Sequence, residues 1–269
     1  MSLWQAAVLG LIQGLTEFLP ISSTAHLYVV PQLLGWSKPT TAFVAVIQLG
    51  TLVAVVAYFW RDLVTITRET LVGRSQIGWM IAVGTIPVVV VGLLFKRHIE
   101  TTLTGLSVIA GAMIGLAVVL ALAEWLTKRR QVLRDMKQVG WRDAIVIGCA
   151  QAVALIPGSS RSGCTITGGL FLGLNRETAA RFSFLLSLPA ILAAGIFELF
   201  EARHELLATQ EHIHHLVAAT VVAGLVGYAS IAFLLGYLKN HTTWLFIIYR
   251  LALGALLFAL VAAGRLSAL

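Results

Sequence analysis

The chain has 269 residues, of which 58% are hydrophobic and only 12% are charged, and its mean hydropathy is +0.90. A soluble domain carries roughly twice that fraction of charged residues, so the composition excludes a soluble globular protein. The apolar runs are continuous, whereas the strands of a membrane barrel would alternate, so we expect an all-α polytopic membrane protein.

The first apolar run, 1–16, is shorter than the roughly 20 residues that a membrane span needs. It leads directly into a polar segment, 17–26, in which Pro20 disfavours a continuous helix. We therefore predict a re-entrant helix–loop–helix whose return arm is 27–34. Three membrane spans are predicted next, over 41–60, 77–95 and 103–123, with polar loops over 61–76 and 96–102.

The second half of the chain follows the same order. The apolar run 144–174 is interrupted by a polar loop, 157–165, and its arms are too short to cross comfortably. This pattern predicts a second re-entrant element. Three further spans are predicted over 182–197, 216–238 and 242–264. A polar, His-containing loop, 201–215, joins the first of these spans to the second.

The two halves also share residues at matching positions. The run 8–13 matches 146–151 with an offset of 138, and the run 19–23 matches 156–160 with an offset of 137. Because three spans are an odd number, the second half must enter the membrane inverted relative to the first. The sequence therefore predicts one membrane domain, 1–269, built from inverted-topology repeats over about 1–126 and 142–269.

Basic residues are unevenly divided between the two predicted sides of the membrane. Eleven lie on one side, namely Arg61, Arg68, Arg74, Lys128, Arg129, Arg130, Arg134, Lys137, Arg142, Arg176 and Lys239. Five lie on the other, namely Lys38, Lys96, Arg97, Arg203 and Arg265. The positive-inside rule makes the first side cytoplasmic and places both termini outside. The net charge of +7 therefore reports orientation and indicates no nucleic-acid partner.

The loop 157–165 has the composition of a phosphate-binding loop. It combines one arginine, four hydroxyl side chains and two glycines. An arginine fork binds phosphate oxygens with two donors, glycines let backbone N–H groups approach an anion, and a following helix would direct its N-terminus at it. We predict that Arg161 is catalytic and that the hydroxyl groups bind substrate; these belong to Ser159, Ser160, Ser162 and Thr165.

The first polar segment carries a carboxylate and an amide on one helix face. Gln13 and Glu17 are four residues apart, so their side chains are neighbours. Oxygen ligands of this kind suit a hard divalent cation, Mg²⁺ or alternatively Ca²⁺, and Glu17 could instead pair with Arg161. Since polar backbone at membrane depth must be buried in protein or line a wet cavity, we expect the two loops to face each other.

The same segment offers two kinds of nucleophile. Ser22 and Ser23 are candidates if a base is near, and His26 lies three residues after Ser23. In the alternative scheme His26 attacks phosphorus directly. We predict that Ser23 attacks phosphorus while His26 takes its proton, and the alternative scheme stays open. The sequence assigns no roles to Arg181 and Arg250, which begin or interrupt apolar spans.

The segments Gln13–His26 and Pro157–Thr165 resemble the two signature motifs of the undecaprenyl-diphosphate phosphatases, the BacA-type family linked to bacitracin resistance. The resemblance extends over essentially the whole chain. It implies a bacterial inner-membrane enzyme that removes the terminal phosphate of a C55 isoprenyl diphosphate, recycling the lipid carrier of cell-wall peptidoglycan synthesis. It further implies divalent-metal dependence and a site open to the periplasm. Gln13 stands where the family has Glu or Gln, and here it is the less acidic option.

A competing interpretation is a transporter or flippase for polyprenyl phosphates or other anions on the same inverted-repeat scaffold. A set of Ser, His, Glu and Arg side chains exceeds what anion passage requires, so the sequence favours the enzyme. The expected partners are the lipid bilayer and a polyprenyl diphosphate. A homodimer is compatible with the sequence, which does not determine oligomeric state or chain-length preference.

The charge distribution generates a topology prediction. The segment 127–142 is the most basic in the chain. A cysteine introduced within it, at Gln131, should escape labelling by a membrane-impermeant thiol reagent added to intact cells. It should react once the cells are permeabilised, while a cysteine at Ser37 should react in intact cells. Ready labelling of position 131 from outside would overturn the orientation.

Overall fold

The computed structural model describes residues 1–264, except for the side chain at position 100. Within this part the chain forms helices and no β-strand. Six of the described helices are long and apolar enough to cross a membrane, which confirms the predicted all-α architecture. They are α3 (Thr41–Tyr58), α5 (Ile77–Thr102), α6 (Leu106–Lys128), α9 (Arg176–Glu201), α11 (Gln210–Asn240) and α12 (Trp244–Ala262).

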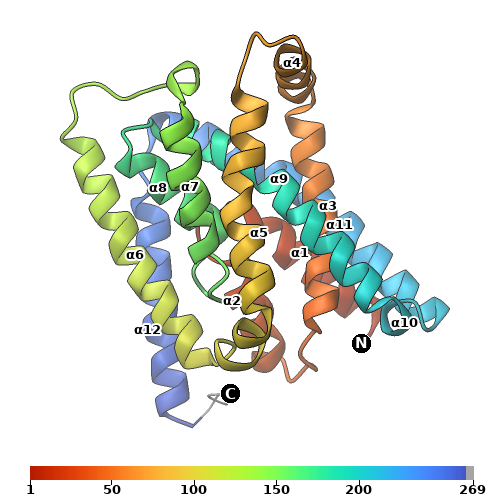
Figure 1. The fold of residues 1–269 in the computed structure, drawn as a ribbon. Helices are drawn as coiled ribbons and strands as arrows, with labels where there is room; N and C mark the ends of the chain where they lie inside the picture. The colour runs from red at the N-terminus through yellow and green to blue at the C-terminus, as the bar shows by residue number, and fades with distance from the viewer. Residues whose placement is uncertain (265–269) are drawn as a thin grey trace.

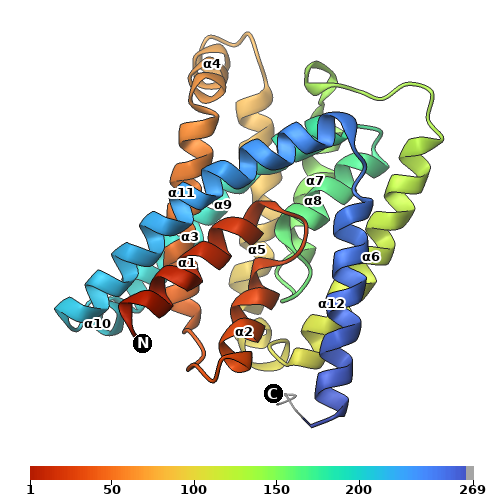
Figure 2. The ribbon, with the colours of Figure 1, turned by 180° about the vertical axis from the view of Figure 1, so that it is seen from behind.

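Two pairs of shorter helices surround the polar motifs. The first pair is α1 (Leu3–Phe18) and α2 (Ser23–Leu33), and the second is α7 (Trp141–Val153) and α8 (Arg161–Phe171). The loops that join them, 19–22 and 154–160, lie within the body of the helix bundle rather than at its ends (Figures 1 and 2). Helix–loop–helix elements thus occur where the sequence predicts them; their re-entry into a membrane stays a prediction.

Three segments predicted as polar loops are partly or wholly helical. The segment 61–76 contains helix α4 (Trp60–Leu71), none of whose residues is buried. Helix α5 continues through 96–102, and 201–215 contains α10 (Arg203–Leu206) and the start of α11. The predictions were wrong because polarity reports exposure to water, whereas a helix satisfies its backbone hydrogen bonds whether its side chains are polar or not. A short 3₁₀ turn, η1 (Met136–Gln138), lies in the basic segment.

Equivalent helices of the two predicted halves make equivalent packing contacts. Helix α1 of the first half packs along α11 of the second, and α7 of the second half packs along α5 of the first. A Cβ atom added at Gly10 would lie 2.3 Å from the Ala219 carbonyl oxygen, and one at Gly148 would lie 2.1 Å from that of Gly84. These two glycines are 138 residues apart and each permits a close crossing of helix backbones.

The backbone also repeats at the two loops. Ser22 and Ser160 have φ values of 73° and 72°, and they are the only described residues other than glycine with positive φ. Each serine caps the next helix, accepting a hydrogen bond from the backbone N–H three residues later. These serines are 138 residues apart, so the backbone pairs Ser22 with Ser160, one residue away from the pairing suggested by the sequence match.

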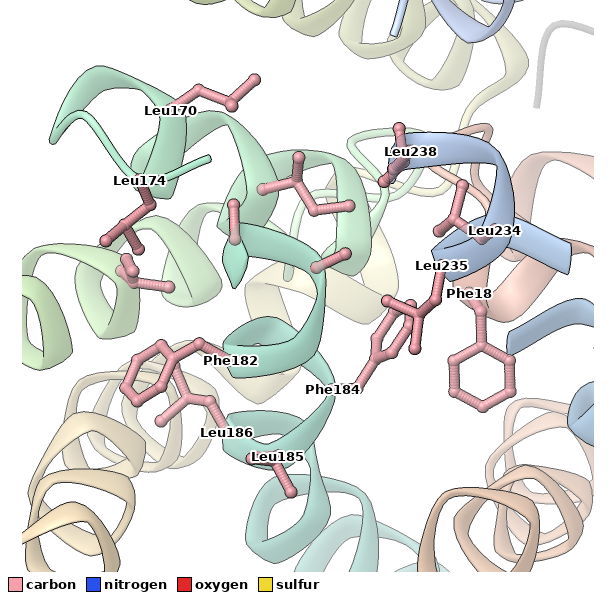
Figure 3. Close-up of a cluster of buried hydrophobic side chains, with 14 of the residues drawn as sticks. Phe18, Leu170, Leu174, Phe182, Phe184, Leu185, Leu186, Leu234, Leu235 and Leu238 are labelled. Atoms are coloured by element: carbon pink, nitrogen blue, oxygen red, sulfur yellow. The ribbon is translucent and has the colours of Figure 1, made fainter. Parts of the chain in front are cut away.

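A cluster of buried apolar side chains lies beside the end of α1 (Figure 3). The Phe18 ring meets the Phe184 ring of α9 edge to face, with the centroids 5.1 Å apart. Leu234, Leu235 and Leu238 of α11 belong to the same cluster, as do Leu170 and Leu174 near α8. Because Phe18 directly follows Glu17, this packing fixes the place where the first polar segment begins.

Ion pairs connect the helices and the connecting segment at the end of the molecule that is predicted to be cytoplasmic. Glu124 of α6 is fully buried, accepts two hydrogen bonds from Arg176 Nε at 3.0 Å each, and also binds Thr243 at the start of α12. Arg134 binds both carboxylate oxygens of Asp143, at 2.6 and 2.9 Å, and this hydrogen bonding raises the pKa of the guanidinium. Arg265 lies outside the described residues, and the single membrane domain over 1–269 stays a prediction.

The helix crossing at Gly148 generates a stability prediction. Gly148→Ala would place a methyl group against the Gly84 backbone, so α7 and α5 must separate at a cost of about 1–3 kcal/mol. Unfolding in detergent, followed by circular dichroism, should begin at a lower temperature than for the unmodified protein. The matched control is Gly115→Ala in α6, where an added Cβ would have no atom of the described residues within 4 Å. Equal melting temperatures for the two variants would contradict the close packing.

Candidate active site

The two polar loops meet in the structure. Ser162 at the start of α8 donates a hydrogen bond to the Leu19 carbonyl oxygen in the first loop, at 3.0 Å. Arg161 Nη1 lies 3.7 Å from Glu17 Oε1. Residues more than 140 positions apart are therefore in contact, and the expectation that the loops face each other is confirmed for these side chains.

Glu17 is the centre of the polar cluster. Its carboxylate is nearly buried, with the residue 8% exposed. Oxygen Oε2 accepts hydrogen bonds from Gln13 Nε2 at 2.9 Å and from the Ser23 hydroxyl at 2.8 Å, while Oε1 faces Arg161. The side chain that can take a proton from Ser23 in this geometry is therefore Glu17.

His26 has other partners. Its Nδ1 lies 2.7 Å from the Ser22 carbonyl oxygen, which only accepts, so Nδ1 carries a hydrogen. Nε2 of the neutral ring then accepts from the Tyr249 hydroxyl at 2.6 Å, and the two rings stack with centroids 5.7 Å apart. The structure thus brings His26 to Tyr249 of α12, and it does not give His26 a hydrogen bond to Ser23.

Arg161 retains donors that the protein does not use. Its Nη2 donates to Gln48 Oε1 of α3 at 3.3 Å, whereas Nη1 has no hydrogen-bond partner among the described residues. The side chain is 25% exposed. Sequence reasoning missed Gln48; the available signal was one amide within the charge-free span 41–60, since polar groups inside a membrane segment are costly.

The four hydroxyl groups of the second loop differ in their hydrogen-bond partners. The Ser159 hydroxyl is buried and has no partner within the described part of the chain. Ser160 accepts from the Gly163 N–H at 3.2 Å, and Ser162 holds the first loop. Thr165 donates to the Arg161 carbonyl at 2.8 Å and contacts Ser183. In this loop, the buried side-chain donors that have no hydrogen-bond partner among the described residues are therefore the Ser159 hydroxyl and Arg161 Nη1.

Two helix N-termini begin at the loops. Helix α2 starts at Ser23 and α8 starts at Arg161, and each is eleven residues long. The N-terminus of a helix carries a partial positive charge and unpaired N–H groups, which favour a bound anion. Together with the Arg161 guanidinium, these N-termini suit a phosphate group better than a neutral or cationic ligand.

The predicted metal ligands form a sparse site. Among the described residues no group of three or more His, Cys, Asp or Glu side chains could hold a metal ion. Gln13 Oε1 is buried beside the Glu17 carboxylate and has no hydrogen-bond partner among the residues that the structure describes. One carboxylate and one free amide oxygen fit a cation such as Mg²⁺, which takes its remaining ligands from phosphate oxygens and water.

Comparison with known proteins agrees with this geometry. Residues 6–256 match the family model described as bacitracin resistance protein BacA. A protein named undecaprenyl-diphosphatase from Chlorobium phaeovibrioides is 59% identical over 280 residues, covering 99% of both chains. Proteins of the same name from Chloroherpeton thalassium and Prosthecochloris aestuarii are 56% and 55% identical over the full length of both chains. This chain therefore belongs to the BacA family of bacitracin resistance proteins.

Proposed function

We propose that this protein is an undecaprenyl-diphosphatase, which hydrolyses undecaprenyl diphosphate to undecaprenyl monophosphate and inorganic phosphate. The observation that carries the proposal is the Ser23 hydroxyl, hydrogen-bonded to Glu17 opposite Arg161 inside a helical membrane protein. The name shared by relatives at 55–59% identity supports the same substrate. Nothing in the fold or in the relatives favours the transporter alternative.

The proposed setting is the bacterial inner membrane, with the site open to the periplasm. The monophosphate product is the lipid carrier of cell-wall synthesis, so its recycling accounts for the link to bacitracin resistance. The excess of basic residues in 128–142 supports a cytoplasmic location for that segment. A homodimer stays a prediction.

In the proposed reaction Arg161 binds the terminal phosphate with its unused donors. The Ser23 oxygen forms a bond to the terminal phosphorus as its proton passes to Glu17, and the bond from phosphorus to the bridging oxygen breaks. Undecaprenyl monophosphate leaves with the proton from Glu17, and the regenerated carboxylate then takes a proton from the water that hydrolyses the phosphoserine to inorganic phosphate and free Ser23. His26 holds the Ser22 carbonyl and so orients the residue before the nucleophile.

A divalent cation is part of the proposal. Glu17 and Gln13 Oε1 would hold it, and it would neutralise charge on the phosphate oxygens. Phosphate release by the purified protein from C55 diphosphate should fall to near background after chelation and return when Mg²⁺ is added. Undiminished turnover in excess chelator would contradict the metal requirement while leaving the phosphatase assignment intact.

The choice of nucleophile leads to a second prediction. Ser23→Ala should lower kcat at least about 10³-fold, because an alanine cannot attack phosphorus. Glu17→Gln should lower it by about 10²–10⁴-fold through loss of the base. His26→Ala should keep a measurable fraction of turnover. The rival scheme predicts the reverse, with no turnover in His26→Ala and a phosphohistidine trapped at position 26.

The arginine fork leads to a third prediction. Arg161→Lys should lose roughly 10²-fold or more in kcat/KM, because one ammonium cannot supply two parallel donors and the contact with Gln48 together. The matched control is Arg203→Lys, at the exposed start of α10, which should keep full activity. A folded Arg161→Lys protein with near-normal turnover would refute the role.

A single assay separates enzyme from transporter. Purified protein in detergent should release phosphate from undecaprenyl diphosphate without any second compartment. Movement of the lipid across vesicles in the absence of phosphate release would favour the transporter instead.

A further inference from the structure

Arg250 is an unusual side chain for the middle of an apolar helix. It lies within the membrane-spanning helix α12 and is 1% exposed. The ion pairs found among the described residues do not include it. A buried cation without a carboxylate is costly, and inside a membrane segment such groups are usually functional.

Within the described part of the chain, the guanidinium of Arg250 donates only to backbone carbonyls. Nη1 lies 3.3 Å from the Pro20 oxygen in the first loop, and Nη2 lies 3.2 Å from the Gly158 oxygen in the second. Two more bonds reach α6, from Nε to Met113 at 3.2 Å and from Nη2 to Ala112 at 3.4 Å. One side chain therefore binds both polar loops and the helix behind them.

The two loop carbonyls occupy equivalent positions in the predicted repeat. Pro20 and Gly158 are 138 residues apart, and each lies two residues before a serine with positive φ. Ala112, which accepts one of the bonds, lies 138 residues before Arg250 itself. Arg250 therefore extends to where the two halves meet, and a single guanidinium serves both loops.

We propose that Arg250 is a positioning residue that holds both catalytic loops in register and places a fixed positive charge behind the diphosphate site. This inference rests on the proposed function. A positive φ at a serine is strained and persists only when its surroundings hold it, and here the guanidinium fixes the carbonyl two residues before each strained serine. The charge adds to that of Arg161 and of the two helix N-termini, and the substrate diphosphate supplies the missing counter-charge.

Gly163 supports this arrangement. A Cβ atom there would lie 2.8 Å from Arg250 Nη1, so the third residue of α8 leaves room for the guanidinium. Any larger residue at this position must displace the fork from the loops. Gly163→Ala should therefore reproduce part of the loss caused by replacing Arg250.

The test compares Arg250→Lys and Arg250→Gln with Arg176→Lys, a control at the buried pair with Glu124. Arg250→Gln should lose about 10²-fold in kcat. Arg250→Lys should keep an intermediate rate, because an ammonium supplies the charge but cannot reach every carbonyl. Arg176→Lys should lower the melting temperature without changing kcat or KM. Unchanged kcat and KM in either Arg250 variant would overturn the proposal; if Arg250→Gln does not fold, Arg250→Lys alone decides.

Hydrogen–deuterium exchange provides a readout that does not depend on the substrate. Arg250→Lys should exchange faster than the unmodified protein in both 19–23 and 157–161, and Arg176→Lys should do so in neither. Faster exchange spread evenly over all helices would show a merely structural role and overturn the inference. If the unmodified protein releases no phosphate while both loops respond to Arg250, the proposed function fails and the positioning role stands.

A double substitution tests the mechanism further. Adding Gly163→Ala to Arg250→Lys should cost less activity than the two single losses combined, because both act on the same contact. Fully additive losses would separate Gly163 from Arg250 and contradict the shared contact.

Discussion

The architecture depends on how two stretches of irregular backbone are satisfied inside an apolar helical molecule. The loops 19–22 and 154–160 lie between helices, so their carbonyls need hydrogen-bond partners outside the regular helical pattern. Short turns bond some of these carbonyls, such as that of Ile156, and side chains from elsewhere bond others: Ser162 binds Leu19, and Arg250 binds Pro20 and Gly158. The contacts that make the loops tolerable are thus the same contacts that bring the chemical groups together.

The two halves have similar backbone conformations at their polar loops but carry different side chains there. Ser22 and Ser160 have the same strained conformation and the same capping role. The residue after each is Ser23 in one half and Arg161 in the other, so equivalent helix starts present a hydroxyl and a cation. Gln13 is followed four residues later by Glu17, whereas its counterpart Gln151 is followed four residues later by Leu155. The amide nitrogen and oxygen of Gln151 both lack hydrogen-bond partners among the described residues. The two helix–loop–helix elements in this way supply a carboxylate and a cation to a single site.

Apolar packing and ion pairs hold this arrangement from two directions. The cluster around Phe18 and Phe184 fixes the end of α1, one residue after Glu17. At the far end, Glu124 joins α6, α9 and the start of α12, the helix that carries Tyr249 and Arg250. Helix α12 is therefore joined to α6 and α9 at its first turn by a buried ion pair.

The sequence by itself determined the fold class, the six spans and the two polar motifs, because uninterrupted apolar length and local spacing are one-dimensional properties. It also placed Gln13 beside Glu17, since residues four apart on a helix are neighbours. It did not determine the partner of Ser23. Proximity in sequence favoured His26, but the turn at Ser22 directs Ser23 back to Glu17 and leaves His26 against Tyr249. Gln48, Tyr249 and Arg250 reach the site from helices distant in the chain, and only tertiary packing decides such contacts, because no local spacing encodes them.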